Sequence, residues 1–333
     1  MKCDFHIHTV FSDGSVWPNI RVQEALKDGL DAISLTEHIE YQPHGEDLPH
    51  PDRNRSYLIA KEQAKAHDLI VVHGAEITRD LPPGHANAIF IKDANKLVLV
   101  DSIEAYREAK RQGGFIFWNH PNWIAQQRNG KATLTDLHRM LIREGLLDGI
   151  EVVNDVTYSD EALQIALDND LTVIGTSDIH GLIDWQYELG RGGHRPVSLV
   201  FATERSEEGI KQALLERRSV AWFNNLLVGN SEVLQPLVEA SIEVVECTYQ
   251  GPSSVATVLL KNDSDAAYIL RNQTEYTFHA HADVITVPAQ SEVKIEVKTG
   301  EQTDQFELSF EVLNAVIAPA THPSITIPVR VDL

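Results

Sequence analysis

The chain begins with MKCDFHIHTVFSDG (residues 1–14), and this stretch indicates the fold of the first part of the protein. The apolar residues around Phe5 predict a β-strand, in which side chains at positions i and i+2 point to the same face. His6 and His8 should therefore lie side by side at the carboxyl end of this strand, and Asp13 follows in the next loop. Imidazole and carboxylate groups without a thiolate are typical of a hydrolytic metal site rather than a structural zinc site.

Similar groups recur as far as residue 180, each close to the end of a further predicted strand. With the first three they make nine candidate metal ligands: His6, His8, Asp13, His38, Glu76, His85, His120, Asp178 and His180. One or two such residues could simply cap loops, as polar residues do in any barrel. Nine of ligand type in succession predict a metal centre.

Short apolar runs alternate with amphipathic stretches over the first two thirds of the chain. We predict strands at 3–7, 32–35, 70–77, 88–91, 115–118, 149–153, 172–175 and 197–201, and helices at 18–27, 56–66, 102–112, 135–143, 160–169 and 206–217. Ser102 and Ser206 precede acidic first turns and are the expected N-caps of their helices. This alternation predicts a parallel sheet covered by helices, and its number of units favours a closed α/β barrel, whose active-site residues come from the carboxyl ends of the strands.

The pattern changes towards the carboxyl terminus. Helical periodicity vanishes after about residue 235, and runs such as QFELSFEV (residues 305–312) alternate apolar with polar residues. Short alternating strands separated by turn residues predict an antiparallel β-sandwich of the immunoglobulin-like kind. We therefore expect two domains, a barrel at 1–235 and an all-β domain at 236–333.

Bulk composition limits the kinds of partner and the cellular setting that the protein can have. The formal net charge is −21, which argues against a nucleic-acid backbone as a partner because polyanions are bound by Lys and Arg. No stretch approaches the roughly 20 apolar residues of a membrane span. Cys3 and Cys247 fall in different predicted domains, so we expect two buried thiols. The first strand begins near Met1, which fits either a cytoplasmic protein or an exported one whose leader has been removed. The sequence gives no indication of the oligomeric state.

The ligand motifs together resemble the PHP (polymerase and histidinol phosphatase) family. The likeness covers residues 2–225 and rests on His-x-His with a following Asp, a His after the second strand, a Glu on the third, a later His-Pro and a final Asp-x-His. It implies a distorted (β/α)7 TIM-like barrel around two or three divalent ions, Mn, Fe or Zn. The family pattern suggests three sets of ligands: His6, His8, Glu76 and Asp178 for one ion, Glu76, His85 and His120 for a second, and Asp13, His38 and His180 for a third.

The resemblance implies a metal-dependent phosphoesterase that hydrolyses a small phosphomonoester or phosphodiester, with a metal-bridging hydroxide as the nucleophile. Phosphate also favours arginine, because its planar fork binds two oxygens. We expect Arg79, Arg191 and His194 to contact the substrate, with His194 as the proton donor. Further candidates lie in the same loops: Arg195 for phosphate, Trp123 and Trp185 for stacking, and Glu37, Glu151 and Asn154 for orienting a ligand imidazole.

Two other functions remain open at this point. An amidohydrolase-like enzyme acting on a non-phosphate substrate also carries His-x-His on its first barrel strand, but it typically adds a metal-bridging lysine that has no counterpart here. A metal-binding interaction protein without catalysis would be favoured by the loss of ligands, and none of the nine is lost. The sequence does not identify the substrate, and it does not distinguish a phosphomonoester from a phosphodiester.

Overall fold

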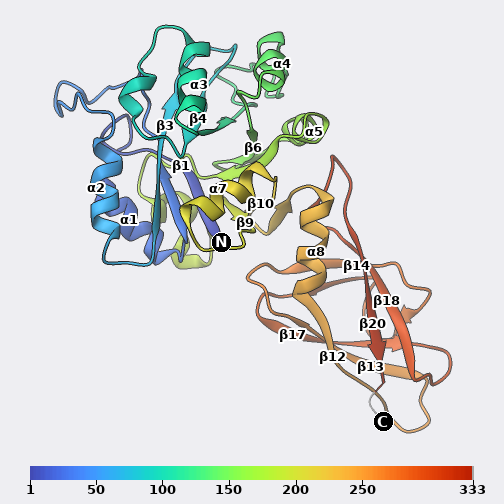
Figure 1. Cartoon of the computed structure of the whole chain (residues 1–333). Coiled ribbons are helices and arrows are strands. Elements are labelled where there is room, and N and C mark those ends of the chain that lie inside the picture. The colour runs from blue at the N-terminus through green and yellow to red at the C-terminus, as the bar shows by residue number, and fades with distance from the viewer. Residues whose placement is uncertain (332–333) are drawn as a thin grey trace. The chain divides into compact units, whose positions relative to one another are not determined.

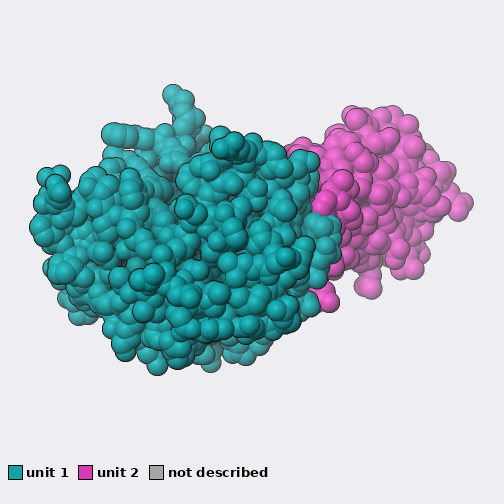
Figure 2. Space-filling view, turned by 90° about the horizontal axis from the view of Figure 1, so that it is seen from above, with its two compact units in different colours: residues 1–224 teal, residues 225–333 magenta. Residues whose placement is uncertain are grey.

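The structure is a computed structural model that describes residues 1–331. The chain divides into two compact units, Met1–Asn224 and Asn225–Leu333, which are coloured separately in Figure 2. The second unit thus includes residues 225–235, which the sequence analysis placed with the barrel. The chain passes from one unit to the next without returning, as the colour gradient of Figure 1 shows.

The first unit is built on one curled sheet with helices around it (Figure 1). Its strands are β1 (Lys2–Ile7), β2 (Ala32–Leu35), β3 (Ile70–Ile77), β4 (Ala86–Ile89), β5 (Phe115–Trp118), β6 (Gly149–Asn154), β7 (Thr157–Tyr158), β8 (Thr172–Thr176), β9 (Val197–Val200) and β10 (Ser219–Phe223). They are hydrogen-bonded in the order β10-β9-β1-β2-β3-β4-β5-β6, and β6 also pairs with both β7 and β8. The expected TIM-like barrel fold is confirmed.

The barrel is distorted because some strands run against the others. β4 is antiparallel to both β3 and β5, and β9 is antiparallel to β1 and β10. The expectation of a wholly parallel sheet was therefore wrong. The physical reason is connection length: the short segment 78–85 between β3 and β4 carries no helix, and a parallel crossover needs a dozen or more residues.

Helices cover the sheet. They are α1 (Pro18–Lys27), α2 (Arg55–Ala64), α3 (Ser102–Arg111), α4 (Asp136–Arg143), α5 (Asp160–Asp168), α6 (Ile183–Tyr187) and α7 (Glu207–Leu215), with 3-10 turns η1 (Ala94–Leu97) and η2 (Leu189–Arg191). Ser206 caps α7 as expected, since its side chain accepts from the amide of Gly209. Ser102 does not cap α3. Asp101, one residue earlier, accepts from two amides of the first turn, because its carboxylate can reach both.

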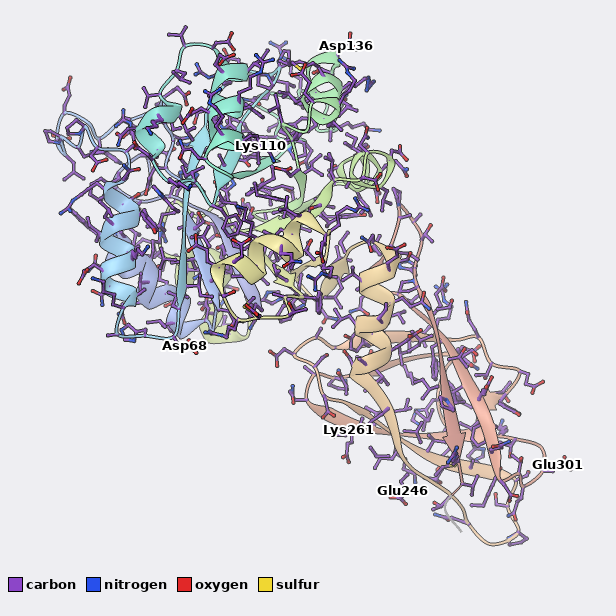
Figure 3. All side chains as sticks on the ribbon, in the orientation of Figure 1. Asp68, Lys110, Asp136, Glu246, Lys261 and Glu301 are labelled. Atoms are coloured by element: carbon purple, nitrogen blue, oxygen red, sulfur yellow. The ribbon has the colours of Figure 1, made fainter. Side chains whose placement is uncertain are left out.

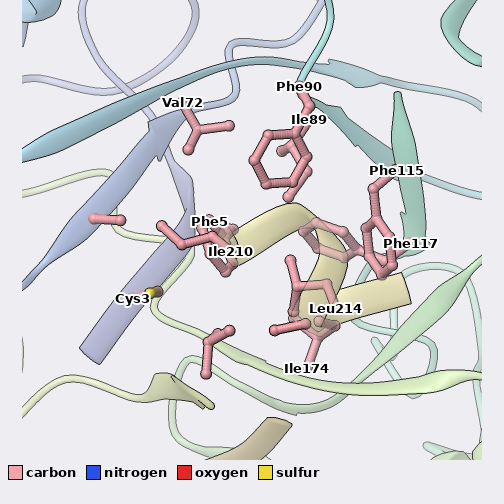
Figure 4. Packing of buried hydrophobic residues seen from close by; sticks show 13 residues of the cluster. Cys3, Phe5, Val72, Ile89, Phe90, Phe115, Phe117, Ile174, Ile210 and Leu214 are labelled. Atoms are coloured by element: carbon pink, nitrogen blue, oxygen red, sulfur yellow. The ribbon is translucent and has the colours of Figure 1, made fainter. Parts of the chain in front are cut away.

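The apolar core explains why β1 presents its histidines to the opposite face. Cys3 and Phe5 are fully buried in a cluster with Ile210 and Leu214 of α7 and with the phenylalanines of β5 (Figure 4). Side chains alternate along a strand, so Asp4, His6 and His8 point away from that cluster. Burial of Cys3 and Phe5 therefore fixes the direction of the ligands.

One contact joins the two segments that carry the first and last ligands. The amide of His8 donates to the carbonyl oxygen of Ile179 at 3.1 Å, and Ile7 forms an isolated parallel bridge with Ile179. The loops after β1 and β8 are thereby held side by side.

The second unit contains two four-stranded antiparallel sheets, ordered β12-β13-β17-β15 and β16-β14-β18-β20. Its elements are β11 (Leu226–Val228), α8 (Ser231–Ser241), β12 (Ile242–Tyr249), β13 (Val255–Asn262), β14 (Tyr268–Asn272), β15 (Thr277–Phe278), β16 (Val284–Val287), β17 (Ser291–Lys298), β18 (Gln305–Val312), β19 (Ala315–Val316) and β20 (Ser324–Arg330). Burial alternates along β18 and β20, as it does in sandwich strands. The expected β-sandwich is confirmed.

The negative charge lies on the surface of both units. Asp68 and Asp136 in the first unit, and Glu246 and Glu301 in the second, are exposed and labelled in Figure 3. Cys3 and Cys247 are both fully buried. Within residues 1–331, no helix combines the length and the apolar content that crossing a membrane requires.

Candidate metal centre

The nine predicted ligands meet at one rim of the curled sheet. His6 lies in β1, Glu76 lies near the end of β3, and the others lie in the connections that flank the strands. His85 comes just before β4, and because β4 runs antiparallel to its neighbours, its amino end reaches the same rim as their carboxyl ends. Strand reversal thus places His85 beside Glu76, with 2.8 Å between its Nδ1 and Glu76 Oε1.

Four of the side chains, from His6, His8, Glu76 and Asp178, lie close to one another. The Nε2 atoms of His6 and His8 are 3.0 Å apart, and each lies 3.1 Å from Oδ1 of Asp178. Oε2 of Glu76 lies 3.7 Å from the first nitrogen and 3.5 Å from the second. Tetrahedral ligands with bonds of about 2.1 Å would be roughly 3.4 Å apart. These spacings fit a divalent ion held by His6, His8, Glu76 and Asp178.

Glu76 is the hub of the centre. Its Oε2 lies 2.7 Å from Nδ1 of His38, while Nε2 of His120 is more distant, at 3.9 Å from Oε1. Although these groups crowd together, Glu76 Oε2, His85 Nδ1 and His120 Nδ1 are buried without a hydrogen bond of acceptable geometry. Buried polar atoms are normally satisfied. Their convergence without hydrogen bonds is what a ligand set for metal requires, so the residues present fit the ions that the sequence analysis expected.

A further group surrounds Asp13. Oδ1 of Asp13 is 3.2 Å from Nε2 of His180, and its Oδ2 is 3.4 Å from Nε2 of His38. Ligating atoms of His8, Asp13, His38 and His180 all lie within 4.8 Å of one another. His38 therefore stands between two groups, with Nδ1 towards Glu76 and Nε2 towards Asp13. The sequence analysis assigned His38 to the Asp13 group alone.

Outer residues orient the ligands. Oε1 of Glu151 lies 2.8 Å from Nδ1 of His6, and its Oε2 accepts from the backbone amide of His120 at 2.6 Å. Glu37 acts indirectly: Ser12 donates to it at 2.6 Å, and Ser12 Oγ lies 3.2 Å from Nδ1 of His8. Such partners fix the ring orientation and tautomer of a ligating histidine.

Electrostatics in the centre favour ionised carboxylates. Burial would raise the pKa of Glu76, but His38 and neighbouring imidazoles hold it well below its usual range. Burial lowers the pKa of His8 to about 3, and the nearby His38 and His180 act in the same direction. Burial alone would lower the pKa of His6, but Asp178 and Glu151 raise it well above its usual range. Because a metal ligand must be deprotonated, His6 would release a proton when metal binds.

Arg21, which sequence reasoning missed, ties the ligand loops together. It lies in α1 and is fully buried. Its Nε donates to the carbonyl oxygen of His8 at 2.9 Å, and its Nη2 donates to that of His180 at the same distance. Its Nη1 pairs with Glu24 at 2.7 Å. Nothing in the amphipathic pattern of this helix distinguishes Arg21 from a solvent-facing arginine.

The predicted arginine and histidine contacts do not gather at the centre. Arg79 pairs with Glu40 at 2.8 Å. Arg191 pairs with Glu188, and His194 stacks on Trp222 at 4.1 Å. Arg191 and His194 line a separate cavity of about 660 Å³, whose described lining includes none of the nine ligands. Their predicted role receives no support from this placement, because the cavity that they line also contains Lys2, the first residue of β1, whereas the ligands lie towards and after the carboxyl end of that strand.

The cavity at the ligands is smaller, about 300 Å³. Six of the nine ligands line it, and the rest of its described lining is Trp123, Asn154, Asp155 and Gln186. Trp123 lies with its ring 5.2 Å from that of His120, as expected for a residue near the site. Trp185 lines the larger cavity instead. Arg195 is buried in ion pairs with Asp4 and Asp28, which makes it a structural residue.

The fold and the site define this chain as a two-domain protein with a TIM-like hydrolase barrel and an appended β-sandwich. Comparison with known proteins agrees for both parts. The family model described as an Ig-like domain matches residues 242–328. A crystal structure from Bacteroides vulgatus, described as a two-domain protein containing a predicted PHP-like metal-dependent phosphoesterase, is 42% identical, with a TM-score of 0.92 over 99% of this chain and 95% of that one.

The chain therefore belongs to the PHP-like metal-dependent phosphoesterase family. A second similarity is local. The uncharacterized protein MJ1295 of Methanocaldococcus jannaschii is 38% identical over 85 residues, which is 25% of this chain. The matched segment spans 36% of that protein.

Proposed function

We propose that the chain is a metal-dependent phosphoesterase that hydrolyses a small phosphomonoester or phosphodiester, with His6, His8, Asp13, His38, Glu76, His85, His120, Asp178 and His180 as its metal ligands. The observation that carries this is that imidazole and carboxylate groups gather around Glu76, where Glu76 Oε2 and His85 Nδ1 are buried without a hydrogen bond. Family membership supports phosphoester chemistry.

In the reaction, water adds its oxygen to phosphorus, the ester P–O bond breaks, and the alcohol leaves with a proton. Divalent ions of the Mn, Fe or Zn kind, two or three in number, would supply a nucleophile at neutral pH by lowering the pKa of water, and would offset charge on the phosphoryl oxygens. The residues of the chain do the remaining work. Glu151 holds the His6 ring, and Arg21 holds the loops of His8 and His180.

The small cavity supports a small substrate. About 300 Å³ is at the lower end of ligand-site volumes and corresponds to the liquid volume of about ten waters. The negative surface charge also disfavours a polyanionic substrate such as a nucleic-acid backbone.

The test is metal content by elemental analysis, followed by hydrolysis of 4-nitrophenyl phosphate and bis(4-nitrophenyl) phosphate before and after chelation. We expect two or three equivalents of metal and turnover that chelation abolishes. The Glu76→Gln variant should lose metal. A matched control is the double variant His279→Ala/His281→Ala, which removes the exposed His-x-His pair of the second unit and should change neither property. A chain that binds no metal on reconstitution would overturn the proposal.

A further inference from the structure

The residues that line the metal-site cavity indicate what kind of alcohol the substrate contains. Apart from the ligands, the described lining is one indole, two amides and one carboxylate, from Trp123, Asn154, Gln186 and Asp155. Neither lysine nor arginine occurs among those lining residues. A second phosphate on the substrate would therefore meet no cation there, and it would meet the carboxylate of Asp155.

Asp155 is fixed in place by its turn and its partners. It is the first residue of the two-residue connection between β6 and β7, which pair through Asn154 and Thr157. Its φ of 50° is one that Asp and Asn tolerate better than most residues. Oδ1 of Asp155 accepts from the side-chain amide of Gln186 and from the hydroxyl of Tyr187 at 3.1 Å. Oδ2 is left to accept a hydrogen bond from a ligand.

The side-chain amides of Asn154 and Gln186, next to Asp155, both use their nitrogen atoms to donate hydrogen bonds within the protein. The side-chain nitrogen of Asn154 donates to Glu151 at 2.8 Å and to the hydroxyl of Thr176 at 3.4 Å. That of Gln186 donates to Asp155 and to the hydroxyl of Tyr187 at 3.3 Å. Each nitrogen being engaged, the carbonyl oxygens are what these side chains offer to a ligand. This side of the cavity is thus rich in acceptors, and it suits a ligand that brings donors.

Trp123 supplies an apolar surface close to the same centre. Its amide donates to the carbonyl oxygen of His120 at 2.9 Å, which holds it in the turn after that ligand. Its ring lies 5.7 Å from His85 and is 44% exposed. An aromatic face beside fixed acceptors suits a ring that has C–H groups on its faces and hydroxyl groups at its edge.

We propose that the substrate is the phosphate monoester of a sugar or cyclic polyol, whose hydroxyl groups donate to Asp155, Asn154 and Gln186 and whose ring packs on Trp123. This inference rests on the proposed phosphoesterase function and adds the substrate class. An aminoalkyl phosphate would also bring donors, but Asp155 already accepts two hydrogen bonds, and the neighbouring groups are neutral amides that suit hydroxyls as well.

The test compares inositol 1-phosphate with cyclohexyl phosphate, which share a six-carbon ring and differ in its hydroxyl groups. For the metal-loaded full chain, we expect kcat/KM to favour inositol 1-phosphate by at least about tenfold, the effect of one or two hydrogen bonds. Asp155→Asn keeps the turn conformation but replaces an acceptor by a donor, and Trp123→Leu removes the aromatic face. Each should bring the ratio of the two kcat/KM values towards one.

Trp185→Leu is the matched control, because Trp185 lines the other cavity and is 81% exposed. It should leave the ratio unchanged. Equal use of the two esters, a ratio unaltered in Asp155→Asn and Trp123→Leu, or a preference for phosphoethanolamine would overturn the polyol assignment. If 4-nitrophenyl phosphate is still hydrolysed in those cases, the phosphoesterase proposal stands. If the metal-loaded chain hydrolyses neither these monoesters nor bis(4-nitrophenyl) phosphate, both proposals fall together.

Discussion

The guanidinium of Arg21 donates to the carbonyl oxygen of His8 at 2.9 Å, from a helix that contributes no ligand itself. The same side chain also reaches the carbonyl oxygens of His180 and Gly181. Arg21 thus links the loop after the first strand to the loop after β8. Since ligands from both loops must be held at bonding distance for an ion to bind tightly, a helix residue controls the geometry of the centre.

Replacing Arg21 by lysine should weaken metal binding while preserving the fold. Lysine keeps the positive charge beside Glu24 but lacks the planar fork that reaches several carbonyl oxygens at once. We expect metal affinity to fall about 10- to 100-fold, the range for loss of an outer partner. Competition with a chelator of known affinity measures this. Arg139→Lys, at an exposed position of α4, is the control. Unchanged affinity in Arg21→Lys would show that Arg21 serves folding alone.

The Glu151→Gln variant tests the orientation of His6. A glutamine offers one acceptor where the carboxylate serves Nδ1 of His6, the amide of His120 and the side chain of Asn154. We expect metal affinity to fall by about one to two orders of magnitude, with an unchanged circular dichroism spectrum. Glu144→Gln, at an exposed residue that follows α4, should retain full affinity. Equal behaviour of the two variants would contradict the role of Glu151.

Chelation should destabilise the first unit selectively. All five tryptophans lie within residues 1–222, so tryptophan fluorescence reports the unfolding of that unit. An ion present at 100 times its dissociation constant adds about 2.7 kcal/mol to the free energy of unfolding. We expect the urea midpoint of the fluorescence transition to fall when metal is removed and to rise again on its return. If the urea midpoint were the same with and without metal, this would argue against a metal site formed in the folded state.

His138 should make the first unit less stable in mild acid. Its side chain is buried, its Nε2 lies 2.6 Å from the carbonyl oxygen of Pro83, and its ring stacks on Trp118. Burial lowers its pKa from 6.5 to about 4. The unfolded chain therefore binds more protons than the folded one between these values, and stability falls as pH drops from 6.5 towards 4.

The expected loss from this one group is about 2 kcal/mol between pH 7 and pH 5. Urea unfolding of the metal-free protein at both pH values gives the measurement, with His138→Gln as the variant. The variant should lose less stability over this interval than the parent. His67→Gln removes an exposed histidine and should follow the parent. If all three lose stability equally, His138 is not the titrating group.

Several features could be predicted from the sequence because they depend on local order along the chain. The alternation of Cys3 and Phe5 with His6 and His8 determines which face of β1 is apolar. The run of apolar strands and amphipathic helices gives the barrel class, and the period-two pattern after residue 241 gives the sandwich. The list of nine candidate ligands follows from residue type and from position near strand ends.

Other features were decided by tertiary structure. The reversal of β4 depends on a short connection and on pairing with two neighbours, and it brings His85 to the rim. Arg191 and His194 are predicted substrate contacts because they follow Asp178 and His180 in sequence, and the structure places them at a separate cavity that Lys2 of β1 also lines. Arg21 and Asp155 carried no local signal, because an arginine in a helix and an aspartate in a turn are ordinary in themselves.

The sequence by itself determined the two-domain architecture, the barrel and sandwich classes and the residue types of the metal centre, since these follow from periodicity and side-chain chemistry. Tertiary structure alone decided that His38 stands between two ligand groups, that Glu76 is the hub, and that the cavity wall consists of acceptors and one indole. Those facts depend on distances between residues far apart in the chain, which packing of the whole barrel sets and no local pattern encodes.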